Sequence, residues 1–118
     1  MSVGQSTVLR TPRLVAVAPT ETTLESYTRL EIRTAKRITV QVYHANAAQT
    51  FSGIVYRRQA GMTGYVVYDD VTLAGVVSGA SKDLVIDCEG TDEIEVRGTL
   101  SGAGGNVQTG TTRISNSP

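Results

Sequence analysis

The sequence contains no tryptophan, and among its 118 residues it has only one phenylalanine (Phe51), one histidine (His44) and one cysteine (Cys88). A single cysteine excludes an internal disulfide, and this histidine and cysteine are too few for a zinc site of the His and Cys type. Without tryptophan, the flat aromatic platforms that often hold sugars are also disfavoured. Valine, isoleucine, leucine and alanine are left to build the core, which therefore has few large anchoring side chains.

Long apolar runs are absent as well. No segment approaches the about 20 consecutive apolar residues that a bilayer-spanning helix needs. Residues 1–11 are polar and lack the apolar region of a secretion signal. We therefore expect no membrane partner, and synthesis and folding in a reducing cytoplasm.

Catalytic chemistry has few candidates in this sequence. His44 and Cys88 would have to meet in space to form a Cys–His pair. His44 is predicted at a strand end beside a polar turn, and Cys88 ends the predicted strand Leu84–Cys88, where a lone thiol is usually structural. The Gly102–Gly105 cluster is not followed by Gly-Lys-Ser or Gly-Lys-Thr, so it is not a phosphate-binding loop. The sequence therefore predicts a non-enzymatic protein without a cofactor.

Acidic residues gather at two places. Asp87, Glu89 and Asp92 surround one predicted turn, a geometry that can hold Ca²⁺ together with backbone carbonyls. Because the EF-hand pattern is missing, a solvated acidic turn is the favoured interpretation, and calcium binding is left open. Asp69-Asp70 is interpreted as a turn between strands rather than as half of the carboxylate pair that a glycosidase needs.

Net charge is zero, but the signs are unevenly distributed. Residues 1–60 carry eight basic and three acidic residues, whereas residues 61–118 carry three basic and eight acidic residues. The favoured interpretation is that strands of the two halves pair within one fold. The alternative is that opposite faces attract neighbouring copies, with arginine as the interface cation. Zero net charge disfavours nucleic-acid binding, although Tyr43 and Tyr56 lie near basic residues and could stack on bases.

Period-two alternation of apolar residues dominates the sequence and predicts β-strands. The clearest case is residues 37–44, whose alternate side chains divide between two faces: Ile38, Val40 and Val42 on one, and Thr39, Gln41 and Tyr43 on the other. Further strands are expected at 13–18, 30–32, 51–58, 64–69, 71–77, 83–88 and 93–99. Only Thr20–Leu30 could be argued as helical, and its threonines favour a strand or loop. About eight strands predict an all-β antiparallel β-sandwich, with a jelly-roll-like barrel as the second choice.

The two ends differ in composition from the middle. Residues 1–12 are polar and stop at Pro12, and residues 101–118 are rich in glycine, serine and threonine. We therefore predict a flexible N-terminal arm over 1–12, a sandwich domain over 13–100, and a C-terminal strand or tail over 101–118. Such arms can become ordered by adding a strand to a neighbouring molecule. The predicted partner contacts are Val8, Leu9, Arg10 and Arg13, together with Arg57 and Arg58.

Residues 28–100 contain Leu-x-Ile followed by Ile-x-Val-x-Val, the segment Phe51-Ser-Gly-Ile-Val-Tyr56, and the segment Asp83–Thr99. With its valine, threonine and glycine, its polar flanks and its few aromatics, this region resembles small structural proteins of tailed bacteriophages. Head decoration, cement and tail-associated proteins are of this kind. The region lacks the tryptophan often found in the central hairpin of tail and fibre modules.

The resemblance implies a virion structural protein, specifically a capsid decoration or stabilising (cement) protein made in the host cytoplasm. Such a protein binds the major capsid protein and its own copies at many identical positions, and it stabilises by mass action because its partner binds only the folded form. The alternative function is a host-facing β-module that binds a glycan or protein through loops at one end of the sandwich. A tail-associated or head–tail protein is a further alternative.

Overall fold

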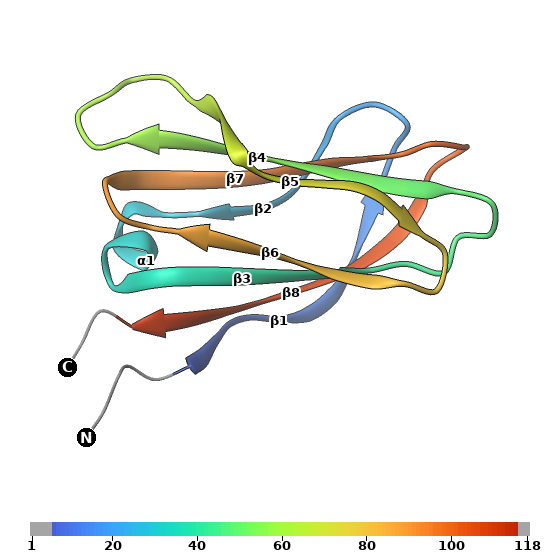
Figure 1. Ribbon diagram of the computed structural model, residues 1–118, viewed down its shortest axis with the longest axis horizontal. Coiled ribbons are helices and arrows are strands. Elements are labelled where there is room, and N and C mark those ends of the chain that lie inside the picture. The colour runs from blue at the N-terminus through green and yellow to red at the C-terminus, as the bar shows by residue number, and fades with distance from the viewer. Residues whose placement is uncertain (1–5, 116–118) are drawn as a thin grey trace.

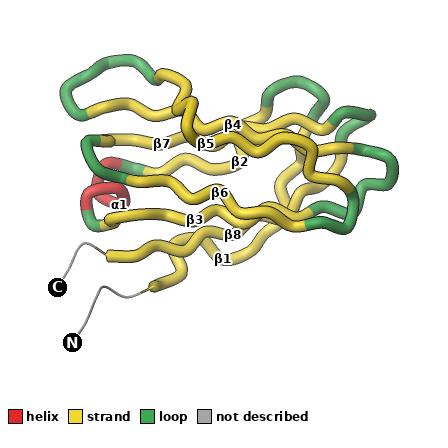
Figure 2. The backbone as a smooth tube through the Cα atoms, viewed as in Figure 1, coloured by secondary structure: helices red, strands yellow, loops and turns green. Residues whose placement is uncertain are grey.

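A computed structural model of the protein describes residues 6–115, and the side chains of all of these except residues 6, 69–71 and 115. Over this range the chain forms eight strands and one short helix: β1 Ser6–Val17, β2 Thr22–Tyr27, α1 Arg29–Arg33, β3 Ala35–Tyr43, β4 Thr50–Gln59, β5 Val66–Val77, β6 Ser81–Asp87, β7 Thr91–Leu100 and β8 Gly105–Ser115. The strands make two antiparallel four-stranded sheets, in the orders β1-β8-β3-β6 and β2-β7-β4-β5. Figures 1 and 2 show the two sheets packed face to face. The prediction of an antiparallel β-sandwich is therefore confirmed.

The core lies between the sheets and follows the predicted alternation. Ile38, Val40 and Val42 of β3 are fully buried. Ile94 and Val96 of β7 face them from the other sheet and are fully buried too. Strand formation and core formation thus have the same origin, because β-branched side chains at every second position fit a pleated surface that is buried on one side.

Phe51, one of the two largest side chains that are fully buried among the described residues, packs across two glycines of the β2-β7-β4-β5 sheet. A Cβ atom added to Gly98 would lie 2.4 Å from two atoms of the Phe51 ring, and one added to Gly53 would lie 3.2 Å from the ring. Gly98 and Gly53 are cross-strand partners of β7 and β4. The ring therefore occupies space that any other residue at position 98 would fill.

One helical turn, α1, replaces part of the strand pattern expected at residues 30–32. Thr28 accepts a hydrogen bond from the Glu31 amide at 3.3 Å, and the Thr28 amide donates to Glu31 Oε1 at 2.9 Å. This capping box satisfies two amide donors at the helix start. Ile32 packs into the core while Leu30 is exposed, so an alternating pair of apolar residues did not signal a strand here. The strand or loop predicted for residues 20–30 is confirmed in β2, but Arg29 and Leu30 at its end begin the helix α1.

The predicted division into arms and domain is corrected by the pairing of β1 with β8. These strands pair along their length, from Ser6 opposite Ile114 to Val17 opposite Gly105, and β8 also pairs with β3. Residues 6–12 and 105–115 therefore belong to the sandwich, because each end supplies the backbone hydrogen-bonding partners that the other needs. Residues 1–5 and 116–118 of the predicted arms lie outside the described residues.

Pro12, which was predicted to end the N-terminal arm, lies within β1 at a shift of register. The pairing jumps from Arg10 opposite Thr111 to Arg13 opposite Thr109. A proline has no amide hydrogen to donate, and an edge strand with a bulge tolerates that loss.

The two strands predicted at 64–69 and 71–77 are a single strand, β5. Register shifts against β4 absorb the Asp69-Asp70 segment, which was predicted to be a turn.

Among the described residues, no helix is long and apolar enough to cross a membrane. The helix α1 has only five residues.

Candidate functional site

The only histidine and the only cysteine lie at opposite ends of the β3–β6 strand pair. In that pair Arg37 is opposite Asp87 and Tyr43 is opposite Ser81, so His44 and Cys88 lie just beyond opposite ends of the paired stretch, about 26 Å apart at about 3.3 Å per residue. They therefore cannot form a catalytic pair in this fold.

Both residues have structural contacts instead. His44 is buried, its Nε2 donates to the Val76 carbonyl at 2.7 Å, and its Nδ1 accepts from the Asn46 amide at 3.2 Å. Burial raises the pKa of the Cys88 thiol to about 11, so the reactive thiolate is scarce at neutral pH.

The acidic turn does not gather its carboxylates around one point. Asp92 is only 2% exposed and accepts hydrogen bonds from Arg29 Nε and Arg58 at 3.0 Å each. Asp87 accepts from the Glu89 amide at 3.0 Å, which closes the turn locally. No group of three or more His, Cys, Asp or Glu side chains that could hold a metal ion occurs among the residues described. The geometry thus supports a structural turn, with arginines already neutralising the buried carboxylate.

Two of the predicted partner contacts join β1 to the other sheet. Arg10 donates to Glu31 Oε1 at 2.9 Å and lies over the Tyr27 ring, and Arg13 Nε donates to Glu25 Oε2 at 3.0 Å. The hydrogen bond from Arg10 lowers the pKa of Glu31 to about 2. These arginines therefore tie the edge strand to the β2–α1 segment, and a role in binding a partner stays a prediction.

The other predicted contacts divide between the surface and the interior. Val8 is exposed, whereas Leu9 packs partly against the core. Arg57 stacks on the Tyr68 ring at 4.3 Å, and Arg58 pairs with Asp92 and Glu93. Arg57 and Arg58 are thus, like Arg10 and Arg13, engaged in contacts within the fold, and a role in binding a partner stays a prediction for them too.

Ion pairs between the two halves of the chain account for much of the uneven charge. Arg29, Arg33 and Arg58 of the first half surround Asp92 of the second. In the opposite direction, Arg97 pairs with Glu21 at 3.0 Å. The interpretation that the halves neutralise each other within one fold is therefore confirmed for these residues.

The outer face of the β2-β7-β4-β5 sheet is closed by its own contacts. Arg97 pairs with Glu21 and Glu95 and lies over the Tyr56 ring at 4.1 Å. Tyr56 in turn donates to Glu21 at 3.1 Å. Because these charges already have partners, a ligand on this face would have to displace them.

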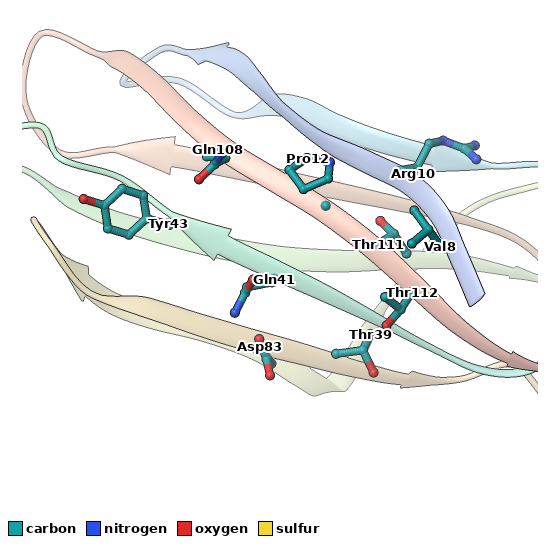
Figure 3. A pocket seen from close by; sticks show the side chains of 11 residues that line it. Val8, Arg10, Pro12, Thr39, Gln41, Tyr43, Asp83, Gln108, Thr111 and Thr112 are labelled. Carbon is teal, nitrogen blue, oxygen red and sulfur yellow. The ribbon is translucent and has the colours of Figure 1, made fainter. Parts of the chain in front are cut away.

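The outer face of the β1-β8-β3-β6 sheet differs, because its polar side chains are not engaged with one another. We define the polar face as six of them: Thr39, Gln41 and Tyr43 of β3, Gln108 and Thr112 of β8, and Asp83 of β6. Tyr43 is opposite Gln108 and Thr39 is opposite Thr112, so the side chains form rows across the strands (Figure 3). Within the described part of the chain, none of the six side chains makes a hydrogen bond or ion pair.

A shallow hollow of about 350 Å³ lies in the polar face. Gly110 forms part of its floor opposite Gln41, where a missing side chain leaves space. Pro12 closes the side toward β1, since a Cβ atom on Gly110 would lie 3.2 Å from the Pro12 ring. Asp83 is opposite Gln41 on the β6 side. The hollow is therefore a trough between the two outer rows, with Pro12 on its β1 side and Asp83 on its β6 side (Figure 3).

Part of this site was predictable and part was not. Alternation correctly placed Thr39, Gln41 and Tyr43 together on the outward side of their strand. Gln108, Thr112 and Asp83 were not singled out, because residues 101–118 were interpreted as a C-terminal strand or tail outside the sandwich domain and the strand neighbours of β3 were unknown. The only available signal was the alternation Gln108-x-Gly110-x-Thr112, with Val107, Thr109 and Thr111 between.

No protein-family model matches the sequence, and no curated protein matches it. Two solved structures share the fold. One is a chain of Bacillus endospore appendages, described as a novel family of disulfide-linked pili, with a TM-score of 0.51, 15% identity, and coverage of 99% of this chain and 96% of that chain. The other is the CBM22-1 xylan-binding domain of Xyn10C from Paenibacillus barcinonensis, with a TM-score of 0.51, 14% identity, and coverage of 96% and 87%. At these identities the likeness shows a shared β-sandwich, and neither protein is a bacteriophage protein.

Proposed function

We propose that the protein is a non-catalytic binding module that holds a glycan on the polar face. The observation that carries this proposal is the contrast between the two outer faces. On one sheet Glu21, Tyr56, Glu95 and Arg97 are paired with one another, whereas on the other sheet six polar side chains without a partner among the described residues surround a trough.

The chemistry of the polar face suits a sugar. Each amide of Gln41 and Gln108 offers two donors and one acceptor oxygen, and the threonine hydroxyls donate and accept, which matches the mixed character of sugar hydroxyls. Tyr43 is 38% exposed, and the apolar face of a sugar ring can pack on its ring. A concave site with an aromatic surface and a few directed polar groups is typical of small-ligand binding.

The fold is compatible with this function. A xylan-binding domain shares the architecture of this chain. The absence of tryptophan does not argue against sugar binding in this fold, because Tyr43 can supply a flat aromatic surface from a strand.

The test is a glycan array of neutral and acidic oligosaccharides, followed by isothermal titration calorimetry of any glycan that binds. Tyr43→Ala should lower the affinity at least about tenfold, since it removes the only aromatic surface of the trough. Tyr65→Ala is the matched control, because Tyr65 is equally exposed at 38% but lies outside the polar face. Binding of no glycan, or equal loss in both variants, would refute the proposal.

A second candidate function is the virion structural role, with the chain assembling in many copies on a capsid. The favouring observation is a group of exposed apolar side chains at the β4–β5 hairpin, which projects from one end of the sandwich (Figure 1). We define the hairpin tip as Met62, Tyr65, Val66 and Val67, all of them exposed. Exposed apolar side chains that gather in one place suit a protein contact.

Assembly through the hairpin tip would be non-covalent. Cys88 is the only cysteine and is 5% exposed, so it is too buried to form a disulfide link with a neighbouring copy. Sedimentation velocity over a range of concentrations, with co-sedimentation on empty phage shells, tests this role. Val66→Lys should weaken association, whereas Val77→Lys, at a similarly exposed position far along β5, should not. A monomer at every concentration with no affinity for shells would remove the candidate.

A further inference from the structure

Resting on the proposed glycan-binding function, we infer that the ligand is an internal stretch of a neutral, linear glycan that occupies two consecutive hollows on either side of Tyr43 and Gln108. A second hollow of about 300 Å³ adjoins the trough. It shares Tyr43 and Gln108 with the trough and adds Leu14, Asn46 and Asn106 to its lining. The row of Tyr43 and Gln108 therefore separates two binding spaces and contacts both.

The length of this surface exceeds that of one sugar. Thr112 lines the trough and Asn106 lines the second hollow, and both belong to β8. Six strand residues span about 20 Å at about 3.3 Å per residue, which is the length of about four linked sugar rings. Both hollows are shallow and open to solvent, so the chain can continue beyond either end. A terminal monosaccharide would leave most of the surface empty.

The charges around the hollows favour a neutral glycan. Among the residues that the structure describes, Asp83 and Arg10 are the only charged ones that line either hollow. Arg10 is already paired with Glu31 and points away from the middle of the trough (Figure 3). Asp83 keeps its negative charge unpaired among the residues described. It can accept hydrogen bonds from sugar hydroxyls, while a carboxylate or sulfate on the glycan would be repelled.

Asn106 provides a variant specific to the second hollow. Its side chain makes no hydrogen bond within the described part of the chain, and only its carbonyl is used, by Asn46 Nδ2 at 2.9 Å. Asn106→Ala therefore removes a ligand-facing amide and keeps the contact that holds the loop. Asn46 itself bridges His44 and β8, so its substitution would disturb the fold and is unsuitable.

The experiment uses titration calorimetry with linear xylo-, cello-, manno- and malto-oligosaccharides from monosaccharide to hexasaccharide, and with oligogalacturonides as the acidic series. We expect the affinity for one neutral series to rise about tenfold or more between disaccharide and tetrasaccharide and then level off. Asn106→Ala should weaken binding of the hexasaccharide about fivefold and that of the disaccharide far less. Asp83→Asn should raise the affinity for oligogalacturonides relative to the neutral series.

Failure of this inference is distinguishable from failure of the proposed function. A neutral series that binds with the same affinity at every length, or an Asn106→Ala variant that binds the hexasaccharide normally, overturns the two-hollow inference and leaves glycan binding intact. Preference for oligogalacturonides overturns the neutral assignment. Binding of none of the series overturns the proposed function as well. A thermal melt of each variant shows whether it is folded, and Gln41→Ala offers a second measurement on the trough if Asp83→Asn is unstable.

Discussion

Substituting alanine for Gly98 tests how this core is packed. The new Cβ atom would lie 2.4 Å from Phe51 Cε1 and Cζ and 3.1 Å from Leu24 Cδ1. Carbon atoms in ordinary contact are about 3.5–4.0 Å apart, so the ring would have to move by about 1 Å. Phe51 is fully buried and also touches Gly53, which leaves it little room to retreat.

The expected loss follows from two opposing effects. Overpacking of a well-filled core costs about 1–3 kcal/mol, and the close approach here places Gly98→Ala at the upper end. Replacing glycine in a strand returns up to about 1 kcal/mol, because less chain entropy is lost on folding. The net decrease in the free energy of unfolding is about 2 kcal/mol, which shifts the midpoint of urea denaturation by about 1 M.

The assay is equilibrium urea denaturation of four proteins: the wild type, Gly98→Ala, Phe51→Leu, and the double variant. Phe51→Leu makes room for the new methyl group, so the double variant should be more stable than the sum of the single losses predicts, by about 1 kcal/mol or more. Gly64→Ala is the control, because nothing lies within 4 Å of its added Cβ. A Gly98→Ala variant as stable as Gly64→Ala, or strictly additive losses in the double variant, would refute the reasoning.

Three other predictions concern the ion pair at β1, the buried thiol and a strained loop. Because the pKa of Glu31 is about 2, below its ordinary value of 4.5, the Arg10–Glu31 pair stabilises the fold above about pH 4.5 and loses that effect as the pH falls toward 2. Glu31→Gln should therefore cost about 1–2 kcal/mol at neutral pH and much less at pH 2, as denaturation at each pH will show. Cys88 should react with a thiol reagent only as fast as the protein opens, and rapid labelling of the native protein would contradict its burial. Ala48 has a positive φ of 60°, so Ala48→Val should lower the stability by about 1–2 kcal/mol in thermal melts, whereas Ala48→Asn should be tolerated.

The candidate site shows which residues a local sequence pattern can place and which it cannot. Alternation along residues 37–44 correctly separated the buried isoleucine and valines from Thr39, Gln41 and Tyr43, because a strand turns every second side chain to the same side. Which residues lie next to these three depends on strand order. Gln108 and Asp83 come from β8 and β6, 65 and 42 positions away from Tyr43 and Gln41 in the sequence, and nothing in the local pattern specifies those distances.

The two ends of the chain show most clearly the difference between what a local pattern predicts and what strand order decides. Val and Ile alternation established the existence of most strands and the all-β class, since burial on one side is a property of each segment alone. The residues at 6–12 and 105–115 looked like arms because polar residues and glycine outnumber apolar residues in both segments. They become strands because β1 and β8 meet in antiparallel register beside β3, where each backbone satisfies the other. That meeting joins residues about 100 positions apart, and it also creates the Gly110 trough by placing Pro12 beside a position without a side chain.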